Sequence, residues 1–257
     1  MSRLRIRCVR HVMRIAGIPT PVSSPTVAVV LPVLNEAAHL GTCLSELQKH
    51  HSVDEILVVD GGSTDASVET VCRHMAADVA RVTPCLLQTS RGRARQMHAG
   101  ALVANSDVLL FLHADVRLPD GAVEQVCVAL RRGYLWGRFD ARLSGRNFLF
   151  RIIERLMNWR SAATGIATGD QAIFVRRDVY HMIGGYAPMD LMEDIEFSKR
   201  LKWVGWPARL HGPVMVSARR WEEKGILRTI LLMWTLRLLY WLGVSPKRLG
   251  RWYYRIT

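Results

Sequence analysis

Acidic residues follow two strand-like segments of this chain. Segment 55–59 runs into Asp60, and the apolar pair Phe111-Leu112 runs into His113-Ala114-Asp115. In an open α/β sheet, ligands bind in the crevice beyond the carboxyl ends of the strands, so we expect Asp60 and Asp115 to face one site. Carboxylates gathered in this way repel one another unless a cation joins them. The pattern therefore predicts a site for Mg²⁺ or Mn²⁺ together with a diphosphate.

The two polar residues of His113-Ala114-Asp115 have different expected roles. An aspartate at a strand end can bind a divalent cation, which then bridges two phosphate groups and neutralises a leaving diphosphate. Because Mg²⁺ and Mn²⁺ prefer oxygen ligands, His113 is either a ligand contact or a packed, hydrogen-bonded side chain. Asp115 is the predicted metal ligand.

A further acidic pair, Glu193-Asp194, begins a helical segment that follows the glycine-containing stretch 184–188. A carboxylate held there could act as general base toward an acceptor hydroxyl. It could equally complement the positive end of the helix. Gly169-Asp170-Gln171, just before a strand-like segment, supplies another candidate carboxylate.

Polar and glycine-rich turns near these acids could contact a ligand. Asn35-Glu36 follow the first strand-like segment and could hold a nucleoside or cap the next helix. Gly61-Gly62 would let a ligand approach the backbone, or would form an ordinary turn. Arg93 is one of three arginines at a helix start, which suits a diphosphate but also a solvated basic face. Arg220-Trp221 could close on phosphates or an acceptor, or could anchor a basic loop.

The elements that must position these residues alternate between strand and helix. Alternation of this kind predicts a mostly parallel sheet with right-handed crossovers and flanking helices, an α/β fold. We expect strands at 27–33, 55–59, 78–82 and 108–112, and helices at 36–48, 63–76, 92–104 and 119–131. After Gly133 we expect an edge strand at 136–143, a helix at 147–159, a strand at 172–176, a helix at 193–203 and two final helices broken at 243–246.

The net charge of +13 is concentrated toward the two ends of the 257-residue sequence. Residues 1–25 carry five arginines and no acid, and residues 219–257 carry nine basic residues against two glutamates. A nucleic-acid groove would run through the folded middle, so the distribution argues against nucleic acid. It favours peripheral contact with an anionic membrane, the alternative being solvated charge. The apolar run 226–244 is not expected to span a bilayer, because Arg228 and Arg237 interrupt it.

The five cysteines show no CxxC spacing, which argues against a disulfide framework or a zinc site and fits a reducing compartment. The predicted location is the cytoplasm, with possible contact to the inner face of the cell membrane. The proline-rich stretch 19–25 is linker-like. We therefore divide the chain into a basic tail at 1–25, a catalytic domain at 26–222 and C-terminal amphipathic helices at 223–257 that pack on the domain or on the membrane surface.

Taken in order, these motifs resemble those of the family 2 glycosyltransferases, inverting enzymes with the GT-A (Rossmann-like) fold. The resemblance covers roughly residues 26–222. Its motifs are Val29-Val30-Leu31-Pro32-Val33-Leu34-Asn35-Glu36, Val58-Val59-Asp60-Gly61-Gly62-Ser63-Thr64-Asp65, Gly92-Arg93-Ala94-Arg95-Gln96-Met97, Phe111-Leu112-His113-Ala114-Asp115, Gly169-Asp170-Gln171, Met192-Glu193-Asp194 and Arg219-Arg220-Trp221. The residues of the later motifs look most like those of a small bacterial subgroup that includes carotenoid-acid glucosyltransferases and proteins linked to arsenosugar biosynthesis.

The resemblance implies a role for each matching residue. Asp194, with Glu193, would be the catalytic base, and Asp115 would bind the metal. The nucleotide sugar would be bound by Pro32, Asn35, Glu36, Asp60, Gly61, Gly62, Arg93, Gln96 and His113. The acceptor or the phosphates would be contacted by Gly169, Asp170, Gln171, Arg220 and Trp221.

The sequence departs from the family in two motifs. His113-Ala114-Asp115 stands where the family has Asp-x-Asp, which leaves the number of metal ligands open. Ser217-Ala218-Arg219-Arg220-Trp221 stands where processive members have Gln-x-x-Arg-Trp, so we expect transfer of a single sugar rather than polymer synthesis.

The predicted reaction is an inverting, metal-assisted transfer of one sugar from a nucleoside diphosphate sugar to an acceptor hydroxyl. A UDP-sugar is the first expectation by family habit, and the acceptor is a small molecule or a lipid-linked one. The alternatives are a glycoside hydrolase, which also uses two carboxylates, a sugar-phosphate nucleotidyltransferase, and a non-catalytic membrane-associated binding module.

Overall fold

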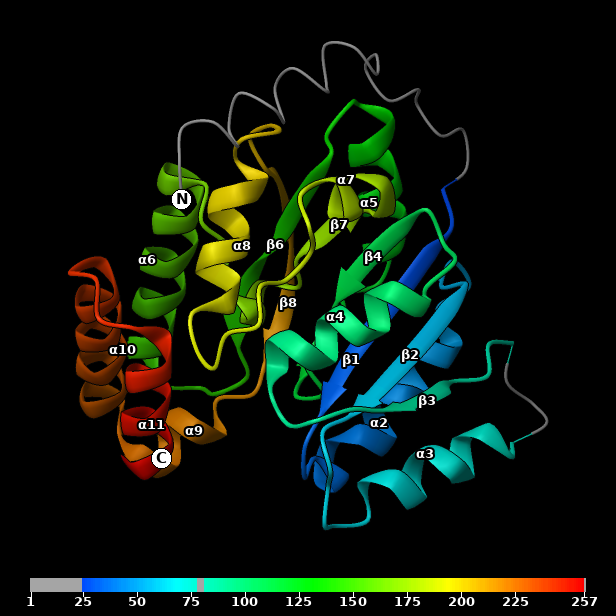
Figure 1. Ribbon diagram of the computed structural model, residues 1–257, viewed down its shortest axis with the longest axis horizontal. Coiled ribbons are helices and arrows are strands. Elements are labelled where there is room, and N and C mark those ends of the chain that lie inside the picture. Colours follow the sequence, from blue (N-terminus) through cyan, green and yellow to red (C-terminus); the bar gives the residue numbers. More distant parts are fainter. Residues whose placement is uncertain (1–24, 78–80, 257) are drawn as a thin grey trace.

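One eight-stranded sheet organises the computed structural model, which describes residues 25–77 and 81–256 (Figure 1). The strand order is β3-β2-β1-β4-β7-β6-β8-β5. The first four strands along the chain are mutually parallel, whereas β7 runs antiparallel to both of its neighbours and β5 runs antiparallel to β8. This mostly parallel sheet with helices on both faces confirms the predicted α/β class.

The central strand shows why the sheet is covered on both faces. β1 (Val27–Val33) is buried at every position, as expected for a parallel strand between two helical layers. Alternate side chains point to opposite faces. Val27, Val29 and Leu31 pack with α2, α3, α5 and α6, whereas Ala28 and Val30 pack with α4, α7 and α8.

The remaining elements follow the chain in regular order. The strands are β2 (Glu55–Asp60), β3 (Cys85–Gln88), β4 (Val108–Phe111), β5 (Val116–Arg117), β6 (Trp136–Leu143), β7 (Phe174–Arg176) and β8 (Ala208–Val216). The helices are α2 (Ala37–Lys49), α3 (Ser67–Met75), α4 (Arg93–Val103), α5 (Ala122–Arg131), α6 (Phe148–Thr164), η1 (Gly169–Gln171), α7 (Arg177–Met182), α8 (Glu193–Leu201), α9 (Arg219–Lys224), α10 (Ile226–Trp241) and α11 (Pro246–Ile256).

Two strand predictions need correction. The third strand of the described residues lies at Cys85–Gln88, where it pairs with Leu57–Asp60. Residues 78–80 of the strand predicted at 78–82 lie outside the described residues, and Arg81 and Val82 are not in a strand. Segment 136–143 is not at an edge, because it pairs with both β7 and β8. β8 was not predicted, because its buried positions are separated by polar or glycine residues such as Arg209 and Gly212.

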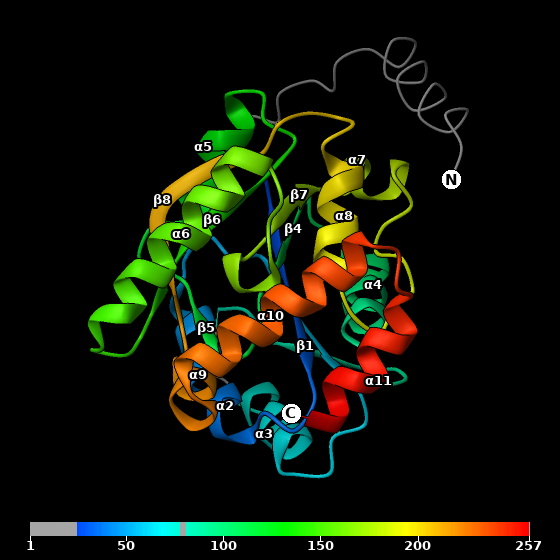
Figure 2. The same cartoon turned by 90° about the vertical axis from the view of Figure 1, so that its left-hand side faces the viewer.

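The last helices pack on the start of α8. Leu236 of α10 and Leu249 and Tyr253 of α11 form a small apolar cluster with Met192 and Ile195. In Figure 2, α10 and α11 cross the face of the molecule beside α6. No helix among the described residues is long and apolar enough to cross a bilayer. The predicted basic tail at 1–25 lies outside the described residues except for its last position.

Candidate functional site

The loops that follow β1 and β2 are fastened to each other by side chains. Asn35 accepts a hydrogen bond from the Thr64 backbone at 2.8 Å and donates its own N–H to the Ser63 hydroxyl at 2.9 Å. Its side chain does not cap α2. The Asp60 carboxylate is buried and accepts the N–H groups of Gly62 and Ser63 at 2.9 and 3.1 Å. Asp60 therefore holds the turn that shapes this end of the sheet.

Gln96 of α4 is hydrogen-bonded to the same two strand ends. It is 2% exposed, and its amide donates to the carbonyls of Val33 and Val59 at 2.7 and 2.8 Å. A Cβ on Gly61 would lie 2.9 Å from the Gln96 amide, so this turn needs glycine. The expected direct contact of Gln96 with a nucleotide sugar is therefore replaced by a supporting role. Pro32 is likewise buried within β1.

A cavity opens between α4, the end of β4, η1, α8 and the C-terminal helices. Its polar lining consists of Arg93, His113, Thr168, Gly169, Asp170, Glu193, Asp194, Arg237 and Tyr253. Neither Asp60 nor Asp115 lines it. Six of the predicted site residues are thus brought together, from four separate segments of the chain.

The acids of α8 are held differently. Asp194 is half-buried and accepts the N–H of Gly169 at 3.0 Å, which ties the start of α8 to η1. Glu193 is 7% exposed. Burial, reinforced by the Asp194 charge and opposed by Arg93, raises the pKa of Glu193 to about 7. Glu193 therefore gains and loses its proton near neutral pH, in the same cavity as Asp194.

Arg93 is the cation opposite these acids. Its side chain keeps an exposed surface at the edge of the cavity. Burial works against its charge, but the carboxylates of Glu193 and Asp170 outweigh it and raise the pKa of Arg93. The guanidinium therefore stays charged and can bind an anion here.

His113 lies between the two groups of acids. Its Nδ1 is 3.8 Å from Asp170. Burial first, and then Arg93, lower the pKa of His113, whereas Asp170, Asp115 and Asp194 oppose this change. His113 is therefore neutral at neutral pH. Asp115 and Asp194 therefore both interact electrostatically with His113. A Cβ on residue 169 would come within 2.6 Å of this ring, which explains Gly169.

Asp115 is the residue best placed for a divalent cation. Its half-buried carboxylate makes no hydrogen bond within residues 25–77 and 81–256. Asp115 also contributes, after burial, to the raised pKa of Glu36. The described part of the chain contains no group of three or more acidic, His or Cys side chains that could hold a metal. One or two carboxylates completed by substrate phosphates is nevertheless the usual magnesium site, and Asp115 fits that donor set.

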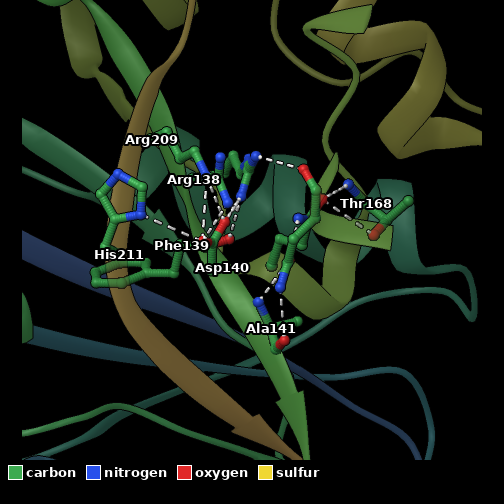
Figure 3. Close-up of polar contacts among 9 residues, drawn as sticks. Arg138, Phe139, Asp140, Ala141, Thr168, Arg209 and His211 are labelled. Carbon is green, nitrogen blue, oxygen red and sulfur yellow. Dashed lines mark hydrogen bonds and ion pairs between the residues drawn. The ribbon is translucent and has the colours of Figure 1, made fainter. Parts of the chain in front are cut away.

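A buried polar network connects β6 and α6 to η1. It was not predicted from the sequence. Figure 3 shows Asp140 surrounded by Arg138, Arg209 and His211. Arg138 is 1% exposed, so Asp140 compensates a fully buried cation. Burial alone would raise the pKa of Asp140, but hydrogen bonds from Arg209 and Arg138 lower it. Arg138 also donates to the backbone carbonyl of Asn158 on α6 at 3.2 Å.

Asn158 connects this network to Gln171 of η1 by a hydrogen bond. Its side chain binds both backbone groups of Ala141 at 2.9 and 3.0 Å and accepts from Gln171 at 3.4 Å. Gln171 is fully buried and accepts the N–H of Thr168. Gln171 therefore fixes η1, and through it the Gly169 N–H, instead of contacting an acceptor as predicted.

Of the motif Arg219-Arg220-Trp221, the structure describes the side chains of Arg219 and Trp221. Trp221 is partly buried and packs on the main core, which matches the anchoring alternative rather than a ligand contact. Arg220 lies in α9, and its side chain is outside what the structure describes. Arg237 and Tyr253 were missed as cavity residues. From the sequence, Arg237 was noted only as a charge that interrupts the apolar run 226–244.

Backbone strain is concentrated around the site. Within the described residues, three non-glycine residues have positive φ: Asn35 at 55°, Ala172 at 45° and Met192 at 67°. They follow β1, end η1 and precede Glu193, respectively. Such conformations persist only where the surrounding structure enforces them, and they cluster at functional sites. This distribution independently marks the loops after β1, at η1 and before α8.

Known proteins resemble this chain in sequence. Residues 28–188 match the model of Glycosyl transferase family 2. The chain is 27% identical over 240 residues to the undecaprenyl-phosphate 4-deoxy-4-formamido-L-arabinose transferase of Klebsiella pneumoniae, a match that covers 87% of this chain and 69% of that protein. It is 27% identical over 183 residues to a PGL/p-HBAD biosynthesis glycosyltransferase of Mycobacterium tuberculosis, with 64% of each chain covered. Against the Aeromonas hydrophila homologue of the first, the match spans half of that protein.

Solved structures show the same fold. The mannosyltransferase of Pyrobaculum calidifontis, determined with GDP-Man and Mn²⁺, superposes with a TM-score of 0.58 at 21% identity and covers 83% of this chain and 63% of that one. TarS of S. aureus with UDP-GlcNAc gives a TM-score of 0.61 at 14% identity, over 75% and 58% of the two chains. The predicted GT-A fold is confirmed.

Proposed function

Because this chain belongs to Glycosyl transferase family 2, we propose that it transfers a single sugar from a nucleoside diphosphate sugar to an acceptor hydroxyl with inversion. The observation that carries the proposal is the meeting of Asp194, Glu193, Arg93 and His113 in one cavity beside the carboxyl ends of the parallel strands. Parallel sheets bind ligands at that edge.

The reaction is a single displacement. The acceptor oxygen forms a bond to the anomeric carbon while the bond from that carbon to the diphosphate oxygen breaks. Asp194 takes the acceptor proton, and its hydrogen bond from Gly169 fixes the carboxylate for this role. The leaving diphosphate carries away the bonding electrons, and Arg93 stabilises its charge.

Asp115, together with the diphosphate oxygens, would hold a Mg²⁺ or Mn²⁺ ion. When bound, the ion neutralises the charge that develops on the leaving group. The neutral His113 imidazole orients this part of the site, between the Asp115 and Asp194 carboxylates.

The donor is bound at the loops after β1 and β2, where Asn35, Glu36 and the Gly61-Gly62 turn form the edge of the site. A UDP-sugar is the first candidate. The cavity between Arg93 and α10 then receives the acceptor. A glycoside hydrolase or a binding module would have no need of the proposed diphosphate site beside Glu193 and Asp194. Nucleotidyl transfer would release pyrophosphate instead of a nucleoside diphosphate.

An exposed apolar surface on α6 and α10 supports peripheral contact with a membrane. On α10 the exposed side chains recur every three or four residues: Leu227, Leu231, Trp234, Leu238 and Trp241. On α6 a second stripe consists of Phe148, Ile152, Leu156 and Trp159. Both helices lie on the face turned to the viewer in Figure 2. Residues 225–256 carry six basic side chains and no acid, so this surface complements an anionic bilayer and would repel a second copy of itself.

The test is a panel of nucleotide sugars assayed by thermal shift with and without Mn²⁺, followed by product analysis. A true donor should stabilise the protein by about 2.7 kcal/mol at a hundredfold excess over its Kd. Turnover should release a nucleoside diphosphate, and Asp194→Asn should lower kcat by about 10²–10⁴-fold while donor binding persists. Near-normal turnover of Asp194→Asn would remove the base assignment, and release of pyrophosphate would remove the proposed reaction.

A further inference from the structure

Two arginines at the α10 side of the molecule, one in the cavity wall and one on α6, have no hydrogen-bond or ion-pair partner among the described residues. Arg237 projects from α10 into the cavity that holds Glu193 and Asp194. Arg160 lies near the end of α6, and the charges of both Arg237 and Asp194 affect its pKa. The two helices run beside each other on one face of the molecule (Figure 2). Arg237 therefore lies in the cavity wall, and Arg160 lies close enough to interact with it electrostatically.

Neither guanidinium forms an ion pair with a carboxylate in the described part of the chain. Within residues 25–77 and 81–256, no hydrogen bond or ion pair joins either side chain to another residue. The Nη2 atom of Arg160 is buried and has no partner. A buried N–H without an acceptor costs about 1–3 kcal/mol, and more when the group is charged. Burial first, and then the charge of Arg237, lower the pKa of Arg160 to about 10, whereas the charge of Asp194 opposes this change.

The position of the pair separates it from the donor diphosphate. In Figure 1 the ends of β1 and β2 lie below the centre, whereas α6 and α10 lie at the left, beyond β6 and β8. Arg93 already faces the acids from α4. The second cationic site therefore belongs to the other substrate.

We propose that Arg160 and Arg237 bind an anionic group, a carboxylate or a phosphate, carried by the acceptor. The assignment to the acceptor rests on the proposed function, whereas the anion site rests on the two arginines themselves. Paired guanidinium groups present several N–H donors in fixed planes, which suits the oxygens of a carboxylate or phosphate.

The walls of the cavity indicate what accompanies the anion. Met233 and Leu236 stand on the same face of α10 as Arg237 and line the cavity with it. Leu191 and Ile173 complete an apolar wall. The exposed stripe of α10 lies on the outer side of the same helix. The acceptor is therefore an amphiphile whose charged group lies at the arginines and whose apolar part lies along α10.

Binding of defined anions to the full chain tests the site without any turnover. The probes are inorganic phosphate, decanoate and decyl phosphate, measured by calorimetry below their micelle concentrations in the absence of nucleotide sugar. The proteins are wild type, Arg160→Met, Arg237→Met and Arg155→Met, the last being an exposed arginine of α6 that serves as control. At least one amphiphile should bind wild type and Arg155→Met equally, and each of the other two variants at least tenfold more weakly.

The remaining outcomes are equally decisive. Equal affinity of all four proteins, or no binding of either amphiphile, overturns the site. Binding of inorganic phosphate as tight as that of decyl phosphate refutes the amphiphilic acceptor. Preference for decyl phosphate or for decanoate identifies the anion as a phosphate or a carboxylate.

Stability without ligand distinguishes a ligand site from a structural one. Because Arg160→Met removes an unpaired buried group, its Tm without anion should equal or exceed that of wild type, and the shift on adding the amphiphile should disappear. A lower Tm would mean that Arg160 serves the fold, and Arg237→Met then still reports on binding. If the anion binds but no nucleotide sugar is used, the proposed function fails and the site stands. If sugar is transferred equally well by both variants, the site fails and the function stands.

Discussion

The buried carboxyl of Glu193 makes a quantitative prediction about stability and pH. Its pKa is about 7 in the folded protein, against an ordinary value of 4.5. The interval of about 2.5, at 1.36 kcal/mol for each pH unit, corresponds to about 3 kcal/mol between the protonated and ionised forms. Because the folded pKa is the higher one, the folded chain binds more protons between pH 4.5 and 7. Its free energy of unfolding therefore falls as the pH rises through that window.

Urea unfolding at pH 5 and pH 8 measures this effect. From pH 5 to pH 8, the wild type should lose about 2.5 kcal/mol more unfolding free energy than Glu193→Gln, which cannot ionise at this position. Glu69→Gln removes an exposed helical carboxyl and serves as the control, so its loss should equal that of the wild type. Equal losses for wild type and Glu193→Gln, within about 0.5 kcal/mol, would refute the assignment of a buried, high-pKa carboxyl beside Asp194.

Three further predictions follow from other parts of the molecule. Asp140→Asn leaves the buried Arg138 without its counter-charge and should lower the free energy of unfolding by about 3–5 kcal/mol in urea, whereas an unchanged value would show that the network contributes no net stability. Ala172→Gly should raise it by about 1 kcal/mol by relieving the positive φ, and a loss of stability would show that this backbone is not strained. Trp234→Ser with Trp241→Ser should abolish co-flotation with anionic vesicles but leave donor binding intact, and persistent flotation would exclude the α10 surface from membrane contact.

The strand-and-helix alternation allowed most of the fold to be predicted, because buried parallel strands read as apolar runs. β1, β2 and β4 appear where that pattern placed them. β8 was missed because its buried residues alternate with Arg209, His211 and Gly212, a pattern that no apolar run reveals. Segment 136–143 was predicted to lie at an edge for the same reason: its alternation includes Arg138 and Asp140, which are buried only because they pair with each other.

The site could be predicted where chemistry and local position agree. Asp115, His113 and Asp194 end a strand or begin a helix, and the fold brings them together. Gln96 and Gln171 also belong to the family motifs, but their side chains are hydrogen-bonded to backbone groups, because a buried amide must satisfy its hydrogen bonds. Arg160 and Arg237 are 77 positions apart in the sequence, so no local pattern could join them.

In the proposed reaction, the contribution of α10 and α11 to the cavity would divide recognition of the two substrates between separable parts of the chain. Met233, Leu236, Arg237 and Tyr253 all come from these helices, whereas the donor end is formed by loops of the sheet. Changes within 226–256 can therefore alter which molecule receives the sugar while the handling of the nucleotide stays the same. A relative could acquire a new product by diversifying this one helical hairpin on an otherwise constant catalytic core.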